Sequence, residues 1–184
     1  MARLNYMVLA IGQKGVGKSS QALKMAIATG KTIIVLDDVV NSVYVGFERI
    51  KREQLPNWKG ARCIVEIDDF DECLKTLSQC QRNAFIICED SSRYISSNIS
   101  LTVKTFIVNH RKFNYDVAFM FHYLGEIPPY ICKQYTHMLL FKTADNLNVT
   151  QNKWMAWHII KPKAEAARKN KSNHHFETIG VNDK

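Results

Sequence analysis

The stretch GQKGVGKSS, from Gly12 to Ser20, decides the fold. The apolar run YMVLAI at 6–11 precedes it and is typical of a strand, and the run QALKMAIA at 21–28 follows it and is typical of a helix. The stretch fits the pattern G-x-x-x-x-G-K-[ST], and the defined positions are Gly12, Gly17, Lys18 and Ser19. Between a buried strand and a helix, such a loop turns its backbone N–H groups inward around phosphate groups.

The loop therefore predicts a site for a nucleoside triphosphate, with ATP and Mg²⁺ as the bound groups. Lys18 is expected to reach the β- and γ-phosphates, and the Ser19 hydroxyl to bind Mg²⁺. The residues expected to contact the nucleotide are Gly12, Gln13, Lys14, Gly15, Val16, Gly17, Lys18, Ser19 and Ser20. Lys14 is not the additional lysine of the ParA/MinD-like loop, because that lysine lies five positions before the invariant one, where this chain has Gln13.

Acidic residues follow two other apolar runs. AFIIC at 84–88 ends in Glu89 and Asp90, and TIIVL at 32–36 ends in Asp37. Ligands gather at the carboxyl ends of parallel strands, so we expect these acids to face the phosphates. Glu89 is placed to hold the water shell of Mg²⁺, with Asp37 in support, and Asp90 to orient or deprotonate the attacking water. The usual order of these two acids is Asp before Glu, and the reversed order leaves open which of them holds the metal. Helix capping by Glu89 and Asp90, or a plain turn at Asp37, is the alternative interpretation.

Apolar runs alternate with helical segments along most of the chain. Strands are expected at 6–11, 32–36, 62–67, 84–88, 116–121 and 137–141, and helices at 18–29, 42–53, 69–80, 97–112 and 128–134. The strands are continuously apolar, as in sheets buried on both faces. This pattern predicts an α/β fold with a mostly parallel central sheet and helices on both faces.

The pattern changes after residue 141. LNVT and KWMAWHII are expected to form an antiparallel hairpin with its turn at 151–152. The sequence thus predicts one P-loop domain over 1–160 and a basic tail over 161–184. His174 and His175 are interpreted as features of that tail and not as ligands.

Composition sets outer limits on the function. The chain has 184 residues, which suits one domain, and its apolar runs are too short to span a bilayer. Its five cysteines contain no C-x-x-C pair, which favours free thiols in a reducing cytoplasm. The N-terminus shows no secretory signal. A net charge of +8 favours a polyanionic partner.

The segment after the acids resembles the FtsK–HerA superfamily of P-loop DNA-pumping ATPases, and most of all the genome-packaging ATPases of viruses and phages. The helix ending in NHRKF places Arg111 at the family's arginine position. His122 follows the strand YDVAFMF at 115–121, where the family has a glutamine sensor, and IPPYI at 127–131 matches the family's next loop. The likeness spans Leu4–Lys142. The chain departs from the family pattern at two points. His122 stands where the family has glutamine, and at 89–90 the order is Glu then Asp, where the family has Asp then Glu.

The resemblance implies a RecA-like (ASCE) fold and a homo-oligomeric ring of five or six subunits that threads double-stranded DNA. ATP would lie between neighbours, with Arg111 of one subunit entering the site of the next, and Arg93 is a second candidate for this role. Such an arginine speeds hydrolysis by roughly 10³–10⁵. A portal or capsid vertex would be a further partner, and the location would be the cytoplasm, of the host if the chain is viral, or the virion.

The DNA contacts themselves are not apparent from the sequence. Lys51, Arg52, Trp58 and Lys59 form a polar connection that suits backbone phosphates, although packing of Trp58 on the sheet explains that residue better. No helix-turn-helix or zinc-finger pattern appears, so non-specific backbone contact is expected.

Three other functions remain as alternatives. A small nucleotide or nucleoside kinase shares the loop but needs an acceptor pocket and an arginine-rich lid. Assembly factors like the filamentous-phage morphogenesis proteins share it too, and usually carry a membrane span after the ATPase part. A nucleotide switch would bind tightly and turn over negligibly.

Overall fold

The computed structural model describes residues 5–80, 83–148 and 150–180. Its eight strands form one sheet in the order β3-β4-β2-β5-β6-β1-β7-β8. The strands are β1 (Met7–Ile11), β2 (Thr32–Leu36), β3 (Glu48–Lys51), β4 (Arg62–Glu66), β5 (Ala84–Cys88), β6 (Asp116–Phe121), β7 (His137–Phe141) and β8 (Phe176–Gly180). All neighbours pair in parallel except β7 and β8, which confirms the predicted α/β class.

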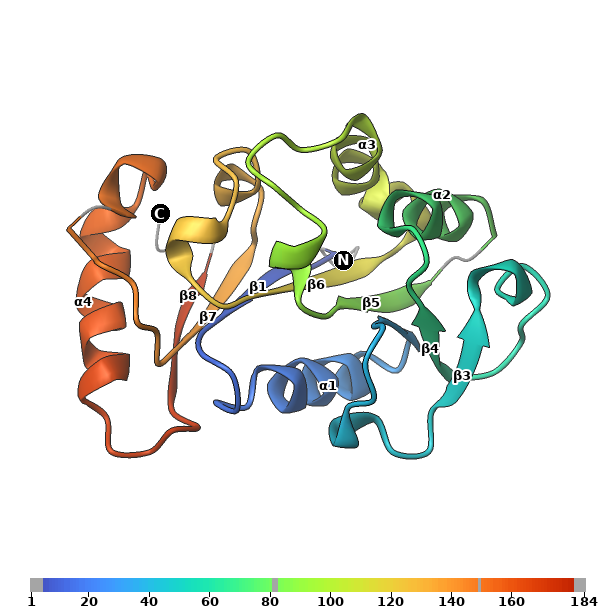
Figure 1. Ribbon diagram of the computed structural model, residues 1–184, viewed down its shortest axis with the longest axis horizontal. Helices are drawn as coiled ribbons and strands as arrows, with labels where there is room; N and C mark the ends of the chain where they lie inside the picture. Colours follow the sequence, from blue (N-terminus) through green and yellow to red (C-terminus); the bar gives the residue numbers. More distant parts are fainter. Residues whose placement is uncertain (1–4, 81–82, 149, 181–184) are drawn as a thin grey trace.

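Helices cover both faces of the sheet. They are α1 (Lys18–Thr29), α2 (Phe70–Cys80), α3 (Leu101–Asn109) and α4 (Trp157–Lys169). Figure 1 shows α1 on one face, α2 and α3 on the other, and α4 beside β7 and β8. Short 3₁₀ helices are η1 (Ser42–Tyr44), η2 (Arg52–Gln54), η3 (Ser91–Arg93), η4 (His110–Phe113), η5 (Leu124–Glu126), η6 (Ile131–Lys133) and η7 (Thr150–Lys153).

The apolar runs form a core on each side of the sheet. Along β1, Leu9 packs into the core beneath α2 and α3, and its neighbours Val8 and Ala10 pack into the core beneath α1. Every residue of β1 is buried, which explains why the run is apolar without alternation. All five cysteines are free, as expected.

Three predicted helices are corrected by the structure. The helix expected over 42–53 is replaced by η1, by η2 and by β3, which pairs with β4 at the edge of the sheet. Of the helix expected over 128–134, only the short η6 forms. The helix expected over 97–112 begins at Leu101, where the Ser100 side chain accepts a hydrogen bond from the backbone N–H of Val103 at 3.1 Å. Pairing along a sheet edge overrides local helical propensity.

The predicted C-terminal hairpin was wrongly placed. An antiparallel strand pair does close this end of the sheet, but β7 pairs with β8, and α4 lies between them in sequence. The second half of the run KWMAWHII, from Trp157 onward, begins α4, which buries Ile160, Ala164 and Ala167 at helical spacing. The boundary expected after residue 160 falls inside α4, and Arg168, expected in the tail, donates from Nε to the carbonyl oxygen of Thr143 at 2.7 Å.

Candidate active site

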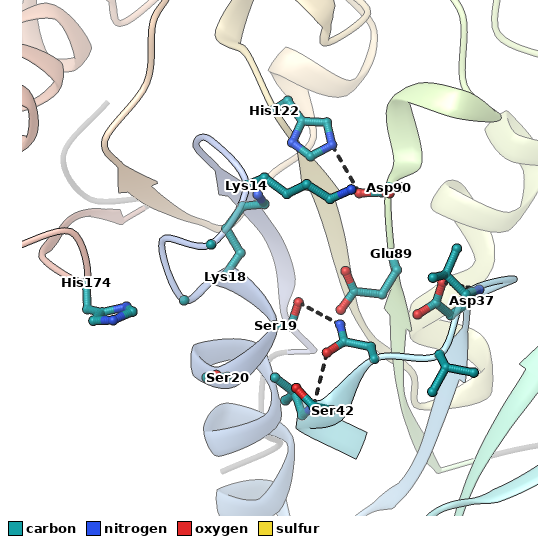
Figure 2. Close-up of a pocket in the computed structure, with 16 residues that line it drawn as sticks. Lys14, Lys18, Ser19, Ser20, Asp37, Ser42, Glu89, Asp90, His122 and His174 are labelled. Atoms are coloured by element: carbon teal, nitrogen blue, oxygen red, sulfur yellow. Dashed lines mark hydrogen bonds and ion pairs between the residues drawn. The ribbon is translucent and has the colours of Figure 1, made fainter. Parts of the chain in front are cut away.

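The site is a cavity of about 440 Å³ at the carboxyl ends of β2, β5 and β6, beside the loop that joins β1 to α1 (Figure 2). Parallel strands bring their carboxyl ends to one edge of the sheet, so residues distant in sequence meet there. The lining residues are Lys14, Gly15, Gly17, Lys18, Ser19, Ser20, Asp37, Val39, Val40, Asn41, Ser42, Val43, Glu89, Asp90, His122 and His174.

The glycines of the loop are required by its geometry. Gly17 has φ 96°, in the left-handed region that favours glycine, where it begins α1. A Cβ at Gly12 would come within 2.6 Å of the Cβ of Phe141 on β7, so the loop can approach the sheet closely only without a side chain there. Both glycines shape the turn that leads from β1 to the start of α1, and the N-terminus of a helix favours an anion.

Lys18 is buried and is held by two backbone carbonyl groups of the loop. Its side chain is only 7% exposed, and Nζ donates to the carbonyl oxygens of Gly12 at 2.6 Å and Gln13 at 2.9 Å. No carboxylate among the described residues lies within ion-pair distance of it. Burial lowers the pKa of Lys18, and the nearby charges of Glu89 and Asp90 oppose this effect. A buried ammonium group beside a helix N-terminus fits the phosphates of a nucleotide.

Glu89 lies deep in the cavity, next to the loop serine. It is 6% exposed and accepts a hydrogen bond from the hydroxyl of Tyr44. Burial raises the pKa of Glu89, and hydrogen bonds from Tyr44 and Ser19 act in the opposite direction. Asn41 completes the group, because its Nδ2 donates to Ser19 Oγ at 3.5 Å (Figure 2). The carboxylate that the sequence assigned to the Mg²⁺ shell is therefore beside the serine that was assigned to the ion.

Asp90 points in another direction, toward the end of β6. Its Oδ1 lies 3.1 Å from Nε2 of His122 (Figure 2). Its backbone has φ 40°, an unusual left-handed conformation for a residue other than glycine. This turn aims the side chains of Glu89 and Asp90 at different partners, so the two adjacent acids are equipped for different tasks.

The donors in the cavity suit Mg²⁺ bound together with phosphates. Asp37 is buried and accepts from the backbone N–H of Val39 at 3.0 Å, and burial raises the pKa of its carboxyl group. No group of three His, Cys, Asp or Glu residues in the described ranges makes a complete metal cage. Mg²⁺ is usually bound through one or two protein oxygens plus waters and substrate phosphates. Ser19 and Glu89, with Asp37 behind them, match that kind of site.

Most of the predicted residues meet in this cavity. Those that line it are Lys14, Gly15, Gly17, Lys18, Ser19, Ser20, Asp37, Glu89, Asp90 and His122. Gly12, Gln13 and Val16 do not line it, and the first two contribute the carbonyl groups that hold Lys18.

Arg111 is placed far from the cavity of its own chain. It is exposed in η4, and the carbonyl oxygen of Phe113 in that turn accepts from the N–H of Asn83, directly before β5, at 2.9 Å. The turn therefore lies at the amino edge of the sheet, whereas the cavity is at the carboxyl edge. Arg93 lies near the cavity, where its Nη1 is 2.7 Å from Asp38 Oδ1 and its guanidinium covers the ring of Tyr94.

The structure adds residues that the sequence did not single out. The segment 39–43 after β2 lines the cavity and contributes Asn41, and the next residue, Tyr44, donates a hydrogen bond to Glu89. From the opposite side His174 reaches the cavity, which corrects its interpretation as a tail feature. The sequence carried a weak signal for Asn41 alone, because Asn-Ser after a strand is a common cap, and its side chain accepts from Val43 N at 3.0 Å.

Tyr44→Phe tests the contact with Glu89. Without the hydroxyl the pKa of Glu89 rises further, because the bond from Tyr44 favours the charged form. A raised pKa means that the carboxylate forms only at higher pH. We therefore expect the acidic limb of the ATPase pH–rate profile to move to higher pH, with activity falling several-fold at acidic pH and recovering at alkaline pH. Tyr130→Phe, which lies outside the cavity, should leave the profile unchanged; equal profiles for both variants would contradict the assignment.

Comparison with known proteins gives one family and one fold. The model of the family described as Zonular occludens toxin (Zot) matches residues 6–176. No curated protein matches the sequence. Among the described residues, no helix is both long and apolar enough to cross a membrane.

Solved structures resemble the chain over nearly its full length. The genome packaging NTPase B204 from Sulfolobus turreted icosahedral virus 2, in complex with sulfate, has a TM-score of 0.77 at 17% identity, covering 99% of this chain and 94% of that one. The same protein in complex with ATP-gammaS has a TM-score of 0.75 at 17% identity, covering 97% of this chain and 93% of that one. VirB4 of Thermoanaerobacter pseudethanolicus has a TM-score of 0.62 at 9% identity, covering 97% of this chain and 90% of that one. These likenesses show a shared fold.

Proposed function

The chain belongs to the Zot family, and from that premise we propose that it is an ATPase that translocates double-stranded DNA and acts as the genome-packaging motor of a virus or phage. The observation that carries the proposal is buried Lys18, held by the loop opposite the acids of β5 in a fold shared with a genome packaging NTPase. A buried cation, backbone amides and two separately aimed carboxylates are what hydrolysis of a phosphoanhydride requires.

The side chains of the cavity have distinct roles in this proposal. Lys18 and the backbone of the loop bind the phosphates, and Ser19 with Glu89 and Asp37 would hold Mg²⁺. The ion supplies charge neutralisation and orientation of the phosphate oxygens when it is bound.

Asp90 acts on the attacking water, and His122 positions Asp90. His122 Nε2 lies 3.1 Å from Oδ1 of Asp90. An imidazole in this place also has a donor for a phosphate oxygen, which suits the position where the packaging family has glutamine.

A ring of subunits is the second part of the proposal. The cavity contains the loop, the metal donors and the acids, but no arginine among the described residues of its own chain lines it. Arg111 is exposed at the other edge of the sheet, so any nucleotide that it contacts belongs to another copy. A ring of five or six subunits provides that contact at every interface.

The proposed DNA partner rests on charge and family resemblance. The net charge is +8, which favours association with a phosphate backbone. The connection 51–59 supports the DNA contact less than the sequence suggested. Trp58 is only 8% exposed, with Nε1 donating to Glu48 at 2.8 Å, which confirms the packing interpretation, and Arg52 pairs with Asp68 at 2.8 Å.

ATP turnover measured with and without linear double-stranded DNA tests the function. We expect DNA to raise turnover and the stimulation to weaken as salt increases, because phosphate contacts release counterions. Lys18→Ala should abolish turnover under both conditions, and Lys24→Ala, further along α1 and outside the cavity, is the matched control.

The alternatives predict different results in the same assay. Phosphate transfer to an added nucleoside, without an effect of DNA, would indicate a kinase. Tight binding with negligible turnover would indicate a switch, and turnover indifferent to double-stranded DNA would favour an assembly ATPase.

A further inference from the structure

The two ends of the cavity differ in chemistry. Glu89, Asp90 and Asp37 lie on one side of the loop and His174 on the other, with Lys18 between them (Figure 2). In the proposed function, Lys18 contacts the β- and γ-phosphates, and hydrolysis takes place at the acids. The terminal phosphate therefore faces the acids, and the nucleoside extends toward the opposite side, where His174 lies.

His174 presents a free aromatic ring at this side. A Cβ built on Gly17 would lie 3.1 Å from Nδ1 of His174, so the ring directly adjoins the start of α1. The residue is exposed, and its ring nitrogens have no hydrogen-bond partner among the residues that the structure describes. The adjacent His175 differs, because its Nε2 lies 2.7 Å from Glu177 Oε1. Among the described residues, the His174 ring contacts the loop at Gly17 without a hydrogen bond to its nitrogens.

The segment that carries His174 is held in place by local bonds and by the sheet. Asn170 Oδ1 accepts from the N–H of Ser172 at 2.9 Å, and Ser172 Oγ accepts from the N–H of His174 at 3.2 Å. Just beyond, Phe176 of β8 packs against Phe141 of β7 with ring centroids 5.0 Å apart. Phe141 is also the residue against which Gly12 packs. The same aromatic pair thus supports the phosphate loop and the segment bearing His174.

We propose that the ring of His174 packs against the nucleoside of the bound nucleotide and contributes to affinity for the base rather than for the phosphates. This inference rests on the proposed nucleotide site. Nucleobases stack on aromatic side chains, and a pre-positioned ring loses little conformational freedom on binding. The segment between α4 and β8 would therefore close the nucleoside end of the site.

Equilibrium binding of ATP and of inorganic tripolyphosphate, each with Mg²⁺, tests the contact by calorimetry on the full chain. For His174→Ala we expect the dissociation constant of ATP to rise roughly 5- to 20-fold, in the range of lost base–aromatic stacking. The constant of tripolyphosphate should stay unchanged, because that ligand has no base. His174→Phe should bind ATP nearly as the wild type does, and His175→Ala is the matched control.

Three results would overturn the proposal. Equal weakening of ATP and tripolyphosphate by His174→Ala would place the ring at the phosphates. Unchanged ATP binding would remove the ring from the site, and a loss in His174→Phe as large as in His174→Ala would exclude stacking. Failure of the wild-type chain to bind ATP, or ATP binding unaffected by Lys18→Ala, would instead refute the nucleotide site itself, so the two failures are distinguishable.

Discussion

Replacing Asp90 with asparagine is expected to lower the turnover number for ATP roughly 10²–10⁴-fold, the usual contribution of a positioned general base. The dissociation constant of ATP should change little, because Asp90 contacts His122 and not Lys18. Asparagine suits the test for a structural reason. The residue has φ 40°, and asparagine is among the residues that tolerate the left-handed region, so the turn after β5 is retained.

Two comparison variants show whether the effect is specific to Asp90 as the general base. Glu66→Gln changes the acid at the end of β4, which pairs with Arg49 outside the cavity, and should leave turnover unaltered. Glu89→Gln should raise the Mg²⁺ concentration needed for half-maximal activity, because Glu89 lies beside Ser19. If Asp90→Asn responded to Mg²⁺ in that way and Glu89→Gln lost turnover at saturating Mg²⁺, the two roles would have to be exchanged.

Arg111→Ala is expected to reduce turnover by roughly 10³–10⁵ if the arginine enters a neighbour's site. Binding of ATP by each chain should persist, because the arginine lies at the opposite edge of the sheet from its own cavity. Lys112→Ala removes an exposed cation from the same turn and should have little effect. Arg93→Ala tests the second candidate for this role. The guanidinium of Arg93 is held by Asp38 on its own chain.

Mixing Arg111→Ala with Lys18→Ala shows whether the arginine acts between subunits. Each variant is expected to be inactive alone. In a mixed ring, some sites combine an intact loop from one chain with an intact Arg111 from its neighbour, so part of the activity should return. Absence of recovery at every ratio, with ring assembly verified by light scattering, would contradict a role between subunits. Full activity of a strictly monomeric protein would do so as well.

Much of the site was accessible from sequence because its parts have local signals. The loop pattern needs only consecutive residues, and the acids follow apolar runs directly, as Glu89 follows β5. Parallel strands then bring these ends together by a general rule of α/β sheets, without knowledge of the strand order. His122 was found through the resemblance to the packaging ATPases, which places it at the sensor position directly after β6.

The remaining parts of the site had no such signal. Tyr44 lies in a segment expected to be helical, and its contact with Glu89 exists because β2 pairs with β5. His174 lies more than 150 positions after the loop that it adjoins, and it arrives there because β8 pairs with β7. Neither pairing follows from residue types at the two positions.

The sequence by itself therefore determined the phosphate loop, the class of fold and the acids at the strand ends, because hydrophobic periodicity and backbone conformation depend on neighbouring residues. Tertiary structure alone decided that Asn41 and Tyr44 bond to Ser19 and Glu89, that His174 lines the other side of the cavity, and that Arg111 lies at the opposite edge of the sheet. These placements result from strand order and packing between distant segments. Such contacts are selected by the free energy of the whole sheet, and no short stretch of chain specifies them.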